Sequence, residues 1–109
     1  MNKYIIVTTL CDKEEIANKI IDTLLEKKLV AGSQMTKVNS KYWWNNKLEE
    51  CNEYKLEFRT NENLFAKIEN EIKKIHDYKV AEISYYEIKN ASKDFLNWID
   101  KNVKEKEVK

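Results

Sequence analysis

The residues that could ligate a transition metal are few in this sequence and far apart along the chain. His76 is the only histidine, and the two cysteines are Cys11 and Cys51. Zinc and copper sites in proteins use several imidazole and thiolate ligands. The candidate metal ligands are therefore His76 and Cys11, brought together by the fold or completed by a second chain. The alternative, which we favour, is that His76 is a polar residue at a helix end, where a protonated imidazole suits the helix dipole.

Cysteine usage and hydropathy also bear on the location of the protein. The two cysteines are neither closely spaced nor part of a dense framework, so we expect two reduced thiols rather than a disulfide. No apolar run approaches the ~20 residues needed to span a bilayer. The apolar stretch near the N-terminus is too short for a signal peptide. We therefore expect a cytoplasmic protein that does not contact a membrane.

The charge balance excludes several classes of binding site. Lys and Arg total 20 against 19 Asp and Glu, which gives a formal net charge of +1. Nucleic-acid binding requires a clear cationic excess or patch, so we expect no nucleic-acid partner. Arg59 is the sole arginine, which excludes a phosphate clamp built from several guanidinium groups. The chain has one glycine and no proline, so glycine-rich phosphate loops are absent.

Three consecutive aromatic residues precede a predicted turn: Tyr42, Trp43 and Trp44. Asn45 and Asn46 follow them, and asparagine tolerates the left-handed conformation that a two-residue hairpin turn requires. Such aromatics at a projecting hairpin tip are difficult to bury within one chain. Protein interfaces are enriched in these residues, so we expect the tip to contact another chain. Stacking on a base or planar ligand is the alternative, and interface packing explains the residues better.

The elements that must position these residues begin with a strand and a helix. Residues 3–10 are apolar and β-branched, which favours a buried strand. Asp12 is predicted to cap a helix, with Glu15 three residues later as in a capping box. The apolar residues of 16–25 recur at helical spacing, and the helix is expected to stop near Lys28.

A long hairpin follows, with strands predicted at residues 29–44 and 48–60. Gly32 is expected to mark a bulge or a close approach of another segment. The later half of the return strand alternates, with Tyr54, Leu56 and Phe58 on one face and Glu53, Lys55, Glu57 and Arg59 on the other. The earlier half has no clean period, so we predict a bulge or a change of face near Cys51.

The last part of the chain repeats the pattern of helix and strand. Asn61 or Asn63 can cap a second helix, whose apolar stripe is Leu64, Ile68, Ile72 and Ile75. Residues 80–88 are predicted to form a strand, and Ser92 to cap a final helix. The order predicts an α+β fold, a ferredoxin-like βαββαβ sandwich with an extended central hairpin and an extra C-terminal helix. We expect one domain over residues 1–109.

Several segments resemble the CutA family of divalent-cation-tolerance proteins. Residues 76–83 are similar to the family motif His-Pro-Tyr-x-x-Pro-Glu-Ile, and residues 92–99 resemble its closing helix. Further similarity lies in Ser-Lys-Tyr-Trp-Trp at 40–44, in Lys-Leu-Glu-Glu at 47–50 and in Arg-Thr at 59–60. The resemblance covers nearly the whole chain, with its elements in the family's order.

The resemblance implies a tight homotrimer related in plan to the trimeric PII signalling proteins. Its hairpins would embrace neighbouring subunits, and its function would be connected with tolerance of copper and other divalent cations, without an established catalytic reaction. We therefore expect a protein that is not an enzyme and whose candidate ligand is a divalent cation. An unknown protein partner is also left open. The residues that would line clefts between subunits are Glu49, Glu53, Arg59, Tyr78 and Glu82.

The sequence departs from the family pattern at particular positions. Asp77 and Ala81 replace the two prolines of the motif, and Gly32 stands where many relatives have a cysteine. Lys55 and Glu57 occupy positions that are usually apolar. If those two positions face the interior of a trimer, their charges must pair with each other or reach water.

Three other functions are less consistent with the residues. A PII-like small-molecule sensor without metal binding is the main alternative, although a single glycine opposes a nucleotide-binding loop. An acylphosphatase would need an arginine and an asparagine around the loop after the first strand, and residues 10–12 supply neither. RNA binding on the open sheet face is opposed by Glu53 and Glu57.

Overall fold

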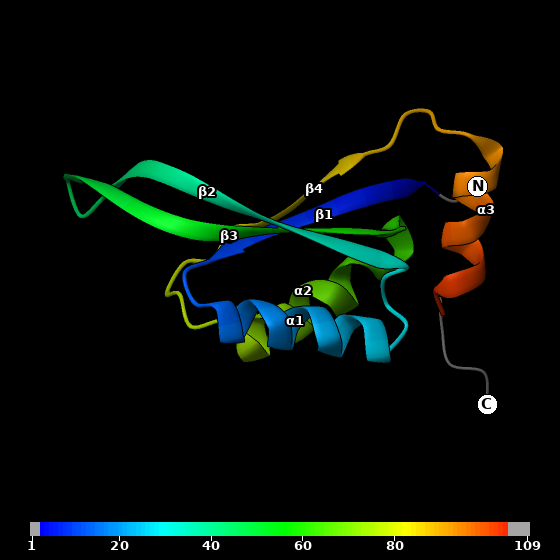
Figure 1. The fold of residues 1–109 in the computed structure, drawn as a ribbon, viewed down its shortest axis with the longest axis horizontal. Coiled ribbons are helices and arrows are strands. Elements are labelled where there is room, and N and C mark those ends of the chain that lie inside the picture. The colour runs from blue at the N-terminus through cyan, green and yellow to red at the C-terminus, as the bar shows by residue number, and fades with distance from the viewer. Residues whose placement is uncertain (1–2, 105–109) are drawn as a thin grey trace.

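The computed structural model of the protein describes residues 3–104. Its elements are β1 (Tyr4–Cys11), α1 (Glu14–Glu26), β2 (Gly32–Trp44), β3 (Lys47–Asn61), a 3₁₀ turn η1 (Glu62–Leu64), α2 (Phe65–Ile75), β4 (Ile83–Glu87) and α3 (Lys93–Asn102). The strands form one antiparallel sheet in the order β2-β3-β1-β4. Helices α1 and α2 cover one face of the sheet, whereas α3 stands at its end (Figure 1). This arrangement confirms the predicted ferredoxin-like fold.

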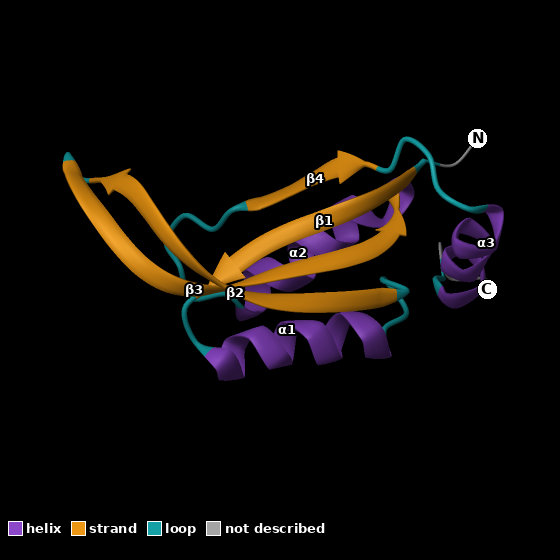
Figure 2. Cartoon of the chain, turned by 45° about the horizontal axis from the view of Figure 1, so that its top comes forward, coloured by secondary structure: helices purple, strands orange, loops and turns teal. Residues whose placement is uncertain are grey.

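The core lies between the sheet and α1 and α2 because alternate strand residues face these helices. The cross-strand pairs Val7–Phe58 and Thr9–Leu56 place four fully buried side chains on that face. The helices contribute Ile20, Leu24, Ile68 and Ile72, which are also fully buried. The predicted alternation in β3 is confirmed, since Lys55, Glu57 and Arg59 lie on the opposite face, which α1 and α2 do not cover (Figure 2).

The start of α1 differs from the prediction. Its N-cap is Lys13, which has an extended conformation and makes no capping hydrogen bond through its side chain. Asp12 therefore does not cap the helix, and its carboxylate lies 3.5 Å from the Lys13 ammonium instead. The helix begins one residue later than a capping box on Asp12 would require. The negative charges of Glu14 and Glu15 in the first turn still interact favourably with the positive end of the helix dipole.

The hairpin is regular along its whole length. Asn45 and Asn46 have φ of 53° and 63°, as the predicted two-residue turn requires. Pairing between β2 and β3 runs without interruption from Gly32–Arg59 to Trp44–Lys47. The predicted bulge or change of face near Cys51 was therefore wrong.

The outer part of the hairpin projects beyond the sheet, which explains its irregular sequence pattern. Strand β1 stops pairing with β3 at Cys11–Tyr54. Residues 38–53, called the arm here, continue as a two-stranded ribbon at the opposite end of the molecule from α3 (Figures 1 and 2). Neither face of the arm packs on a helix, so no alternation of apolar and polar residues is required there.

Gly32 marks a close approach rather than a bulge. A Cβ atom at this position would lie 2.8 Å from the outer edge of the Trp98 ring. Trp98 belongs to α3, whose N-cap is Ser92 as predicted, because the Ser92 hydroxyl accepts a hydrogen bond from the Phe95 amide at 3.2 Å. The missing side chain thus lets α3 rest on the start of β2.

In the second half, one of the two predicted caps is confirmed, and one strand is shorter than predicted. Asn61 is the cap before α2, since its side chain accepts from the Asn63 amide at 2.9 Å, and the first turn is 3₁₀. Strand β4 covers only Ile83–Glu87 instead of residues 80–88. The reason is that its pairing with β1 extends only from Thr9–Ile83 to Ile5–Glu87.

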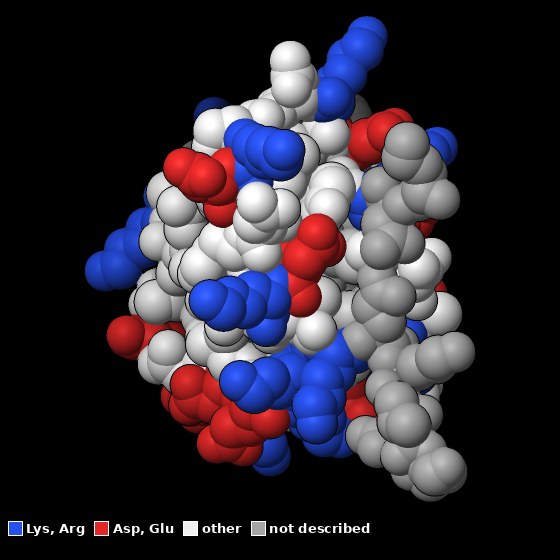
Figure 3. Space-filling model, turned by 90° about the vertical axis from the view of Figure 1, so that its right-hand side faces the viewer, with Lys and Arg blue, Asp and Glu red and all other residues white. Residues whose placement is uncertain are grey.

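The surface carries both signs of charge. Lys, Arg, Asp and Glu side chains are interspersed on the face where α3 stands (Figure 3). None of the helices in residues 3–104 is long and apolar enough to cross a membrane.

Candidate functional site

A cleft lies between the arm and the segment that follows α2. It has a volume of about 730 Å³. The arm contributes Tyr42, Trp43 and Trp44, the three aromatics predicted to meet another chain. The other lining residues include Leu10, Ser40, Glu53, Tyr78 and Glu82. The fold therefore gathers the predicted aromatic tip and three of the five predicted cleft residues at one place.

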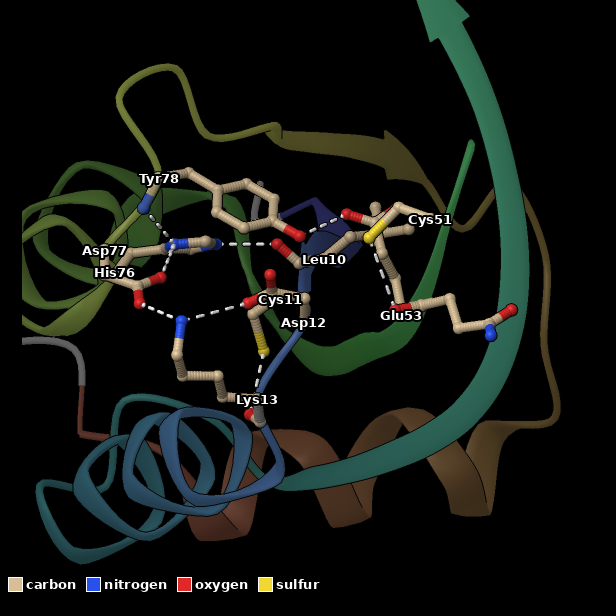
Figure 4. Close-up of polar contacts among 10 residues, drawn as sticks. Leu10, Cys11, Asp12, Lys13, Cys51, Glu53, His76, Asp77 and Tyr78 are labelled. Atoms are coloured by element: carbon tan, nitrogen blue, oxygen red, sulfur yellow. Dashed lines mark hydrogen bonds and ion pairs between the residues drawn. The ribbon is translucent and has the colours of Figure 1, made fainter. Parts of the chain in front are cut away.

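Glu53 and Tyr78 form the central polar contact of the cleft. Glu53 is only 7% exposed. Its carboxylate accepts a hydrogen bond of 2.7 Å from the Tyr78 hydroxyl. Burial, followed by this bond and the negative charge of Glu53, raises the pKa of the Tyr78 hydroxyl. Tyr78 therefore remains protonated and acts as a donor to the carboxylate (Figure 4).

His76 holds the segment that carries Tyr78. Its Nε2 lies 2.6 Å from the Leu10 carbonyl oxygen, and its Nδ1 accepts a hydrogen bond from the Tyr78 amide at 3.2 Å. These partners assign the neutral tautomer with the proton on Nε2. The side chain is 1% exposed, and its ring also packs against Tyr78, with centroids 4.7 Å apart. His76 is thus at the end of α2, as predicted, and acts as a positioning residue through both ring nitrogens.

An ion pair attaches the same segment to the loop after β1. The Lys13 ammonium lies 2.8 Å from an Asp77 oxygen (Figure 4). This hydrogen bond lowers the pKa of the Asp77 carboxyl and raises the pKa of Lys13. Asp77 occupies the position of the first proline in the family motif, so here an ion pair fixes a segment that proline would stiffen.

The predicted metal ligands lie at the same end of β1, but neither is available to an ion. Both ring nitrogens of His76 have partners within the chain. Cys11 is fully buried, and burial raises the pKa of its thiol to about 11, which disfavours the thiolate that a metal requires. Across residues 3–104, no group of three or more His, Cys, Asp or Glu side chains is arranged to hold a metal ion. The part of one chain that the structure describes therefore does not join His76 and Cys11 in a metal site.

The two remaining predicted cleft residues lie elsewhere. Glu49 is exposed on the arm, opposite Tyr42. Arg59 is at the other end of β3, paired with Gly32 and Ile6, and its Nη1 is buried without a hydrogen-bond partner. The structure thus separates both from the contact between Glu53 and Tyr78.

Comparisons with known proteins agree with the geometry. The profile of the family described as CutA1 divalent ion tolerance protein matches residues 5–102. This chain belongs to the CutA1 family. A CutA relative from Archaeoglobus fulgidus is 34% identical over 94% of this chain and 99% of its own. One from Pyrococcus horikoshii is 32% identical over 92% of this chain and 98% of its own. Both are called divalent-cation tolerance proteins.

Solved structures of CutA1 proteins share the fold. The crystal structure of the Archaeoglobus fulgidus protein, which is described as periplasmic, superposes with a TM-score of 0.90 at 32% identity and covers 93% of this chain and 99% of that one. The Oryza sativa CutA1 structure gives a TM-score of 0.91 at 25% identity, covering 95% and 96%. The predicted family membership is confirmed, and the expected cytoplasmic location stays a prediction.

Sequence reasoning missed three residues that shape this site in the CutA1-family chain. Lys13 and Asp77 come from segments 64 positions apart, so no local pattern links them. Leu10 contributes its backbone carbonyl, which side-chain chemistry does not reveal. The one available signal was that Asp77 directly follows His76 inside the family motif.

Proposed function

We propose that this CutA1-family protein is a non-catalytic binding protein that assembles into a homotrimer through its arm and takes up a ligand in the adjacent cleft. We propose that this binding contributes to divalent-cation tolerance, for which its relatives are named. The observation that carries the proposal is the apolar surface of the arm. Trp43 is 73% exposed and Leu48 is 64% exposed in the single chain.

The arm is expected to be stabilised by contact with another chain. An isolated two-stranded ribbon is marginally stable in water, and its apolar side chains gain free energy when another surface covers them. In a cyclic assembly, each arm can contact the next subunit through the face that carries the Trp43–Leu48 pair until the ring closes. Tyr42 and Trp44 lie on the opposite face of the arm, which lines the cleft. Three copies is the number that the family resemblance implies.

The charges on the uncovered sheet face are compatible with assembly. The Lys55 ammonium lies 4.0 Å from a Glu57 oxygen, and the Tyr86 hydroxyl donates to Glu57 at 3.1 Å. These contacts already compensate the charges that replace the usual apolar residues of the family. Burying such a pair costs less than burying one unpaired charge.

The groups at the cleft favour binding over catalysis. Tyr78 has a raised pKa and donates to Glu53, so it is a poor base. His76 has both nitrogens engaged and is almost completely buried. Neither group is free to move a proton to or from a bound molecule.

Two ligand classes were expected, and the geometry favours one of them. A copper or other divalent cation would need ligands from a second chain, since the described part of one chain gathers no such group. A small molecule, as in the PII-like alternative, fits a cleft of about 730 Å³ directly. We therefore propose small-molecule binding as the direct activity, with metal tolerance as its context.

Light scattering on a size-exclusion column tests the assembly. The expected mass is about three times the 13.1 kDa of one chain. A Trp43→Ser/Leu48→Ser double variant should lower this mass, because it removes apolar surface from the arm. Leu25→Ser is the matched control, since Leu25 is an apolar residue 38% exposed on α1. A monomeric wild type, or a double variant with unchanged mass, would overturn the proposal.

A further inference from the structure

We propose that the cleft beside the arm binds a small organic cation through its primary ammonium group, with the Glu53 carboxylate as counter-ion. This inference rests on the proposed function, because it names the ligand class of the same cleft.

The first step is the charge at the floor of the cleft. Glu53 is buried, with only 7% of its surface exposed to solvent. Its one hydrogen-bond donor among residues 3–104 is the neutral hydroxyl of Tyr78. No Lys, Arg or His nitrogen of these residues lies within ion-pairing distance of it. A desolvated carboxylate without a counter-ion is unfavourable, so a cation that enters the cleft stabilises it.

The second step is the aromatic wall. Tyr42 and Trp44 lie on the same face of the hairpin as Glu53, because Glu53 pairs with Val38 and alternate residues of β2 share that face. Both are 40% exposed and line the cleft. Aromatic faces attract ammonium groups through their negative quadrupole, most strongly where water is excluded. A carboxylate beside indole and phenol rings is therefore suited to an organic cation.

The third step separates an organic cation from a metal ion. Ca²⁺ takes six to eight oxygen ligands, and zinc and copper sites use several nitrogen or sulfur ligands. In this cleft Asp77 is already paired with Lys13 at 2.8 Å, and Glu82 accepts from the Ser84 hydroxyl at 3.2 Å.

Lys41 and Lys79 also line the cleft, but both are exposed and neither pairs with Glu53. Glu53 is the one buried carboxylate among the lining residues, and a single buried carboxylate among aromatic rings matches a single ammonium group better than a divalent ion.

The fourth step is the number of acceptors. A primary ammonium has three N–H donors. The cleft contains the Glu53 carboxylate and the hydroxyl oxygens of Tyr78 and Ser40. A quaternary ammonium has no N–H and would leave these acceptors unused, so the primary amine is the favoured form.

Titration of the wild-type protein with benzylammonium, followed by tryptophan fluorescence, tests this inference. We expect saturable binding, with the isosteric benzyl alcohol and the anion benzoate each at least about tenfold weaker, because they lack the positive charge. This comparison uses only the unaltered protein and so does not depend on how a variant folds. Equal binding of benzyl alcohol, or no binding of benzylammonium, would overturn the inference.

Glu53→Gln supplies the second measurement, since glutamine keeps the shape and can still accept from Tyr78. Its affinity for benzylammonium should fall at least about tenfold. The matched control is Glu49→Gln, which removes a carboxylate from the same strand and face but outside the cleft, and it should bind like the wild type. An equal loss in both variants would contradict a specific role of Glu53.

The mass of each sample in solution separates this inference from the proposed function. A trimeric wild type that does not discriminate benzylammonium from benzyl alcohol would refute the ligand class and leave the assembly standing. A monomeric wild type that binds benzylammonium through Glu53 would refute the assembly and support the ligand class.

Discussion

At the scale of single residues, the contact between Gly32 and Trp98 shows how one absent side chain determines where a helix lies. Trp98 is 41% exposed, yet its ring edge fills the space beside the Gly32 backbone. The φ of Gly32 is not positive, so the position does not need glycine for its backbone conformation. The requirement is purely steric, which makes it accessible to a double-mutant test.

Gly32→Ala is predicted to destabilise the protein by about 1–3 kcal/mol, because its Cβ would meet the Trp98 ring at 2.8 Å and α3 would have to shift. In a Trp98→Leu background the same substitution should cost much less. Urea unfolding of the four proteins at one protein concentration measures the interaction free energy. Equal costs in both backgrounds would show that the ring contact does not constrain position 32.

The polar residues of the cleft illustrate a second point at this scale. His76, the only histidine, was a candidate metal ligand in the sequence. In the structure its hydrogen bonds position Tyr78 beside Glu53. The chemical type of the residue is the same in both interpretations. Its hydrogen-bond partners decide its role, and they come from β1 and from the segment after α2.

At the scale of secondary-structure elements, the end of α1 contains a residue in an unfavourable conformation. Lys28 has a φ of 59°. The Lys28 amide donates to the Leu25 carbonyl and the Leu29 amide to the Leu24 carbonyl, which is the hydrogen-bond pattern of a Schellman motif. The motif seats Leu29 beside Leu24 in the core. A left-handed conformation is costly for any residue with a Cβ.

Lys28→Gly is therefore predicted to stabilise the protein by about 0.5–1 kcal/mol, since glycine adopts this conformation without strain. Lys28→Ala is the matched control, because it removes the same side chain and keeps the Cβ. It should give no gain in the free energy of unfolding. Thermal or urea denaturation would detect the difference, and an equal gain from alanine would assign the effect to the lysine side chain instead.

At the scale of the whole molecule, the arm and the sheet are separable parts of one hairpin. The core side chains of β3 end at Leu56, whereas the exposed apolar residues of the arm lie from Tyr42 to Leu48. Hydrogen-bonded and non-hydrogen-bonded pairs alternate along an antiparallel ladder. Removing an even number of residues from each strand therefore preserves both the register and the faces.

Deletion of residues 41–44 and 47–50 tests the role of the arm in assembly. The Asn45–Asn46 turn would then join Ser40 to Cys51, which are already paired. We expect a folded chain with a cooperative melt, because the core is untouched, and a mass close to that of a single chain. A shortened protein that still forms the wild-type oligomer would place the main subunit contacts on the sheet rather than on the arm.

Local sequence patterns were enough to predict the order of elements and the faces of the core. Alternation at Leu56 and Phe58, helical spacing at Ile68 and Ile72, and the Asn45–Asn46 turn all predicted local structure correctly, because these signals act over a few neighbouring residues. At Asp12 the carboxylate lies beside the Lys13 ammonium instead of capping α1, whereas the failure near Cys51 comes from the projection of the arm beyond β1. Local patterns do not reveal whether a third strand or a helix packs against a segment.

The contents of the cleft depend on long-range packing that no local pattern reveals. The residues Leu10, Glu53 and Tyr78 come from three separate elements, and their meeting depends on where β1 ends and on how residues 76–82 pass over that end. The same fold leaves Glu49 and Arg59 outside the cleft, although they were grouped with Glu53 by resemblance. Burial and the choice of hydrogen-bond partner are properties of the packed chain, and they determine the charge and reactivity of each group.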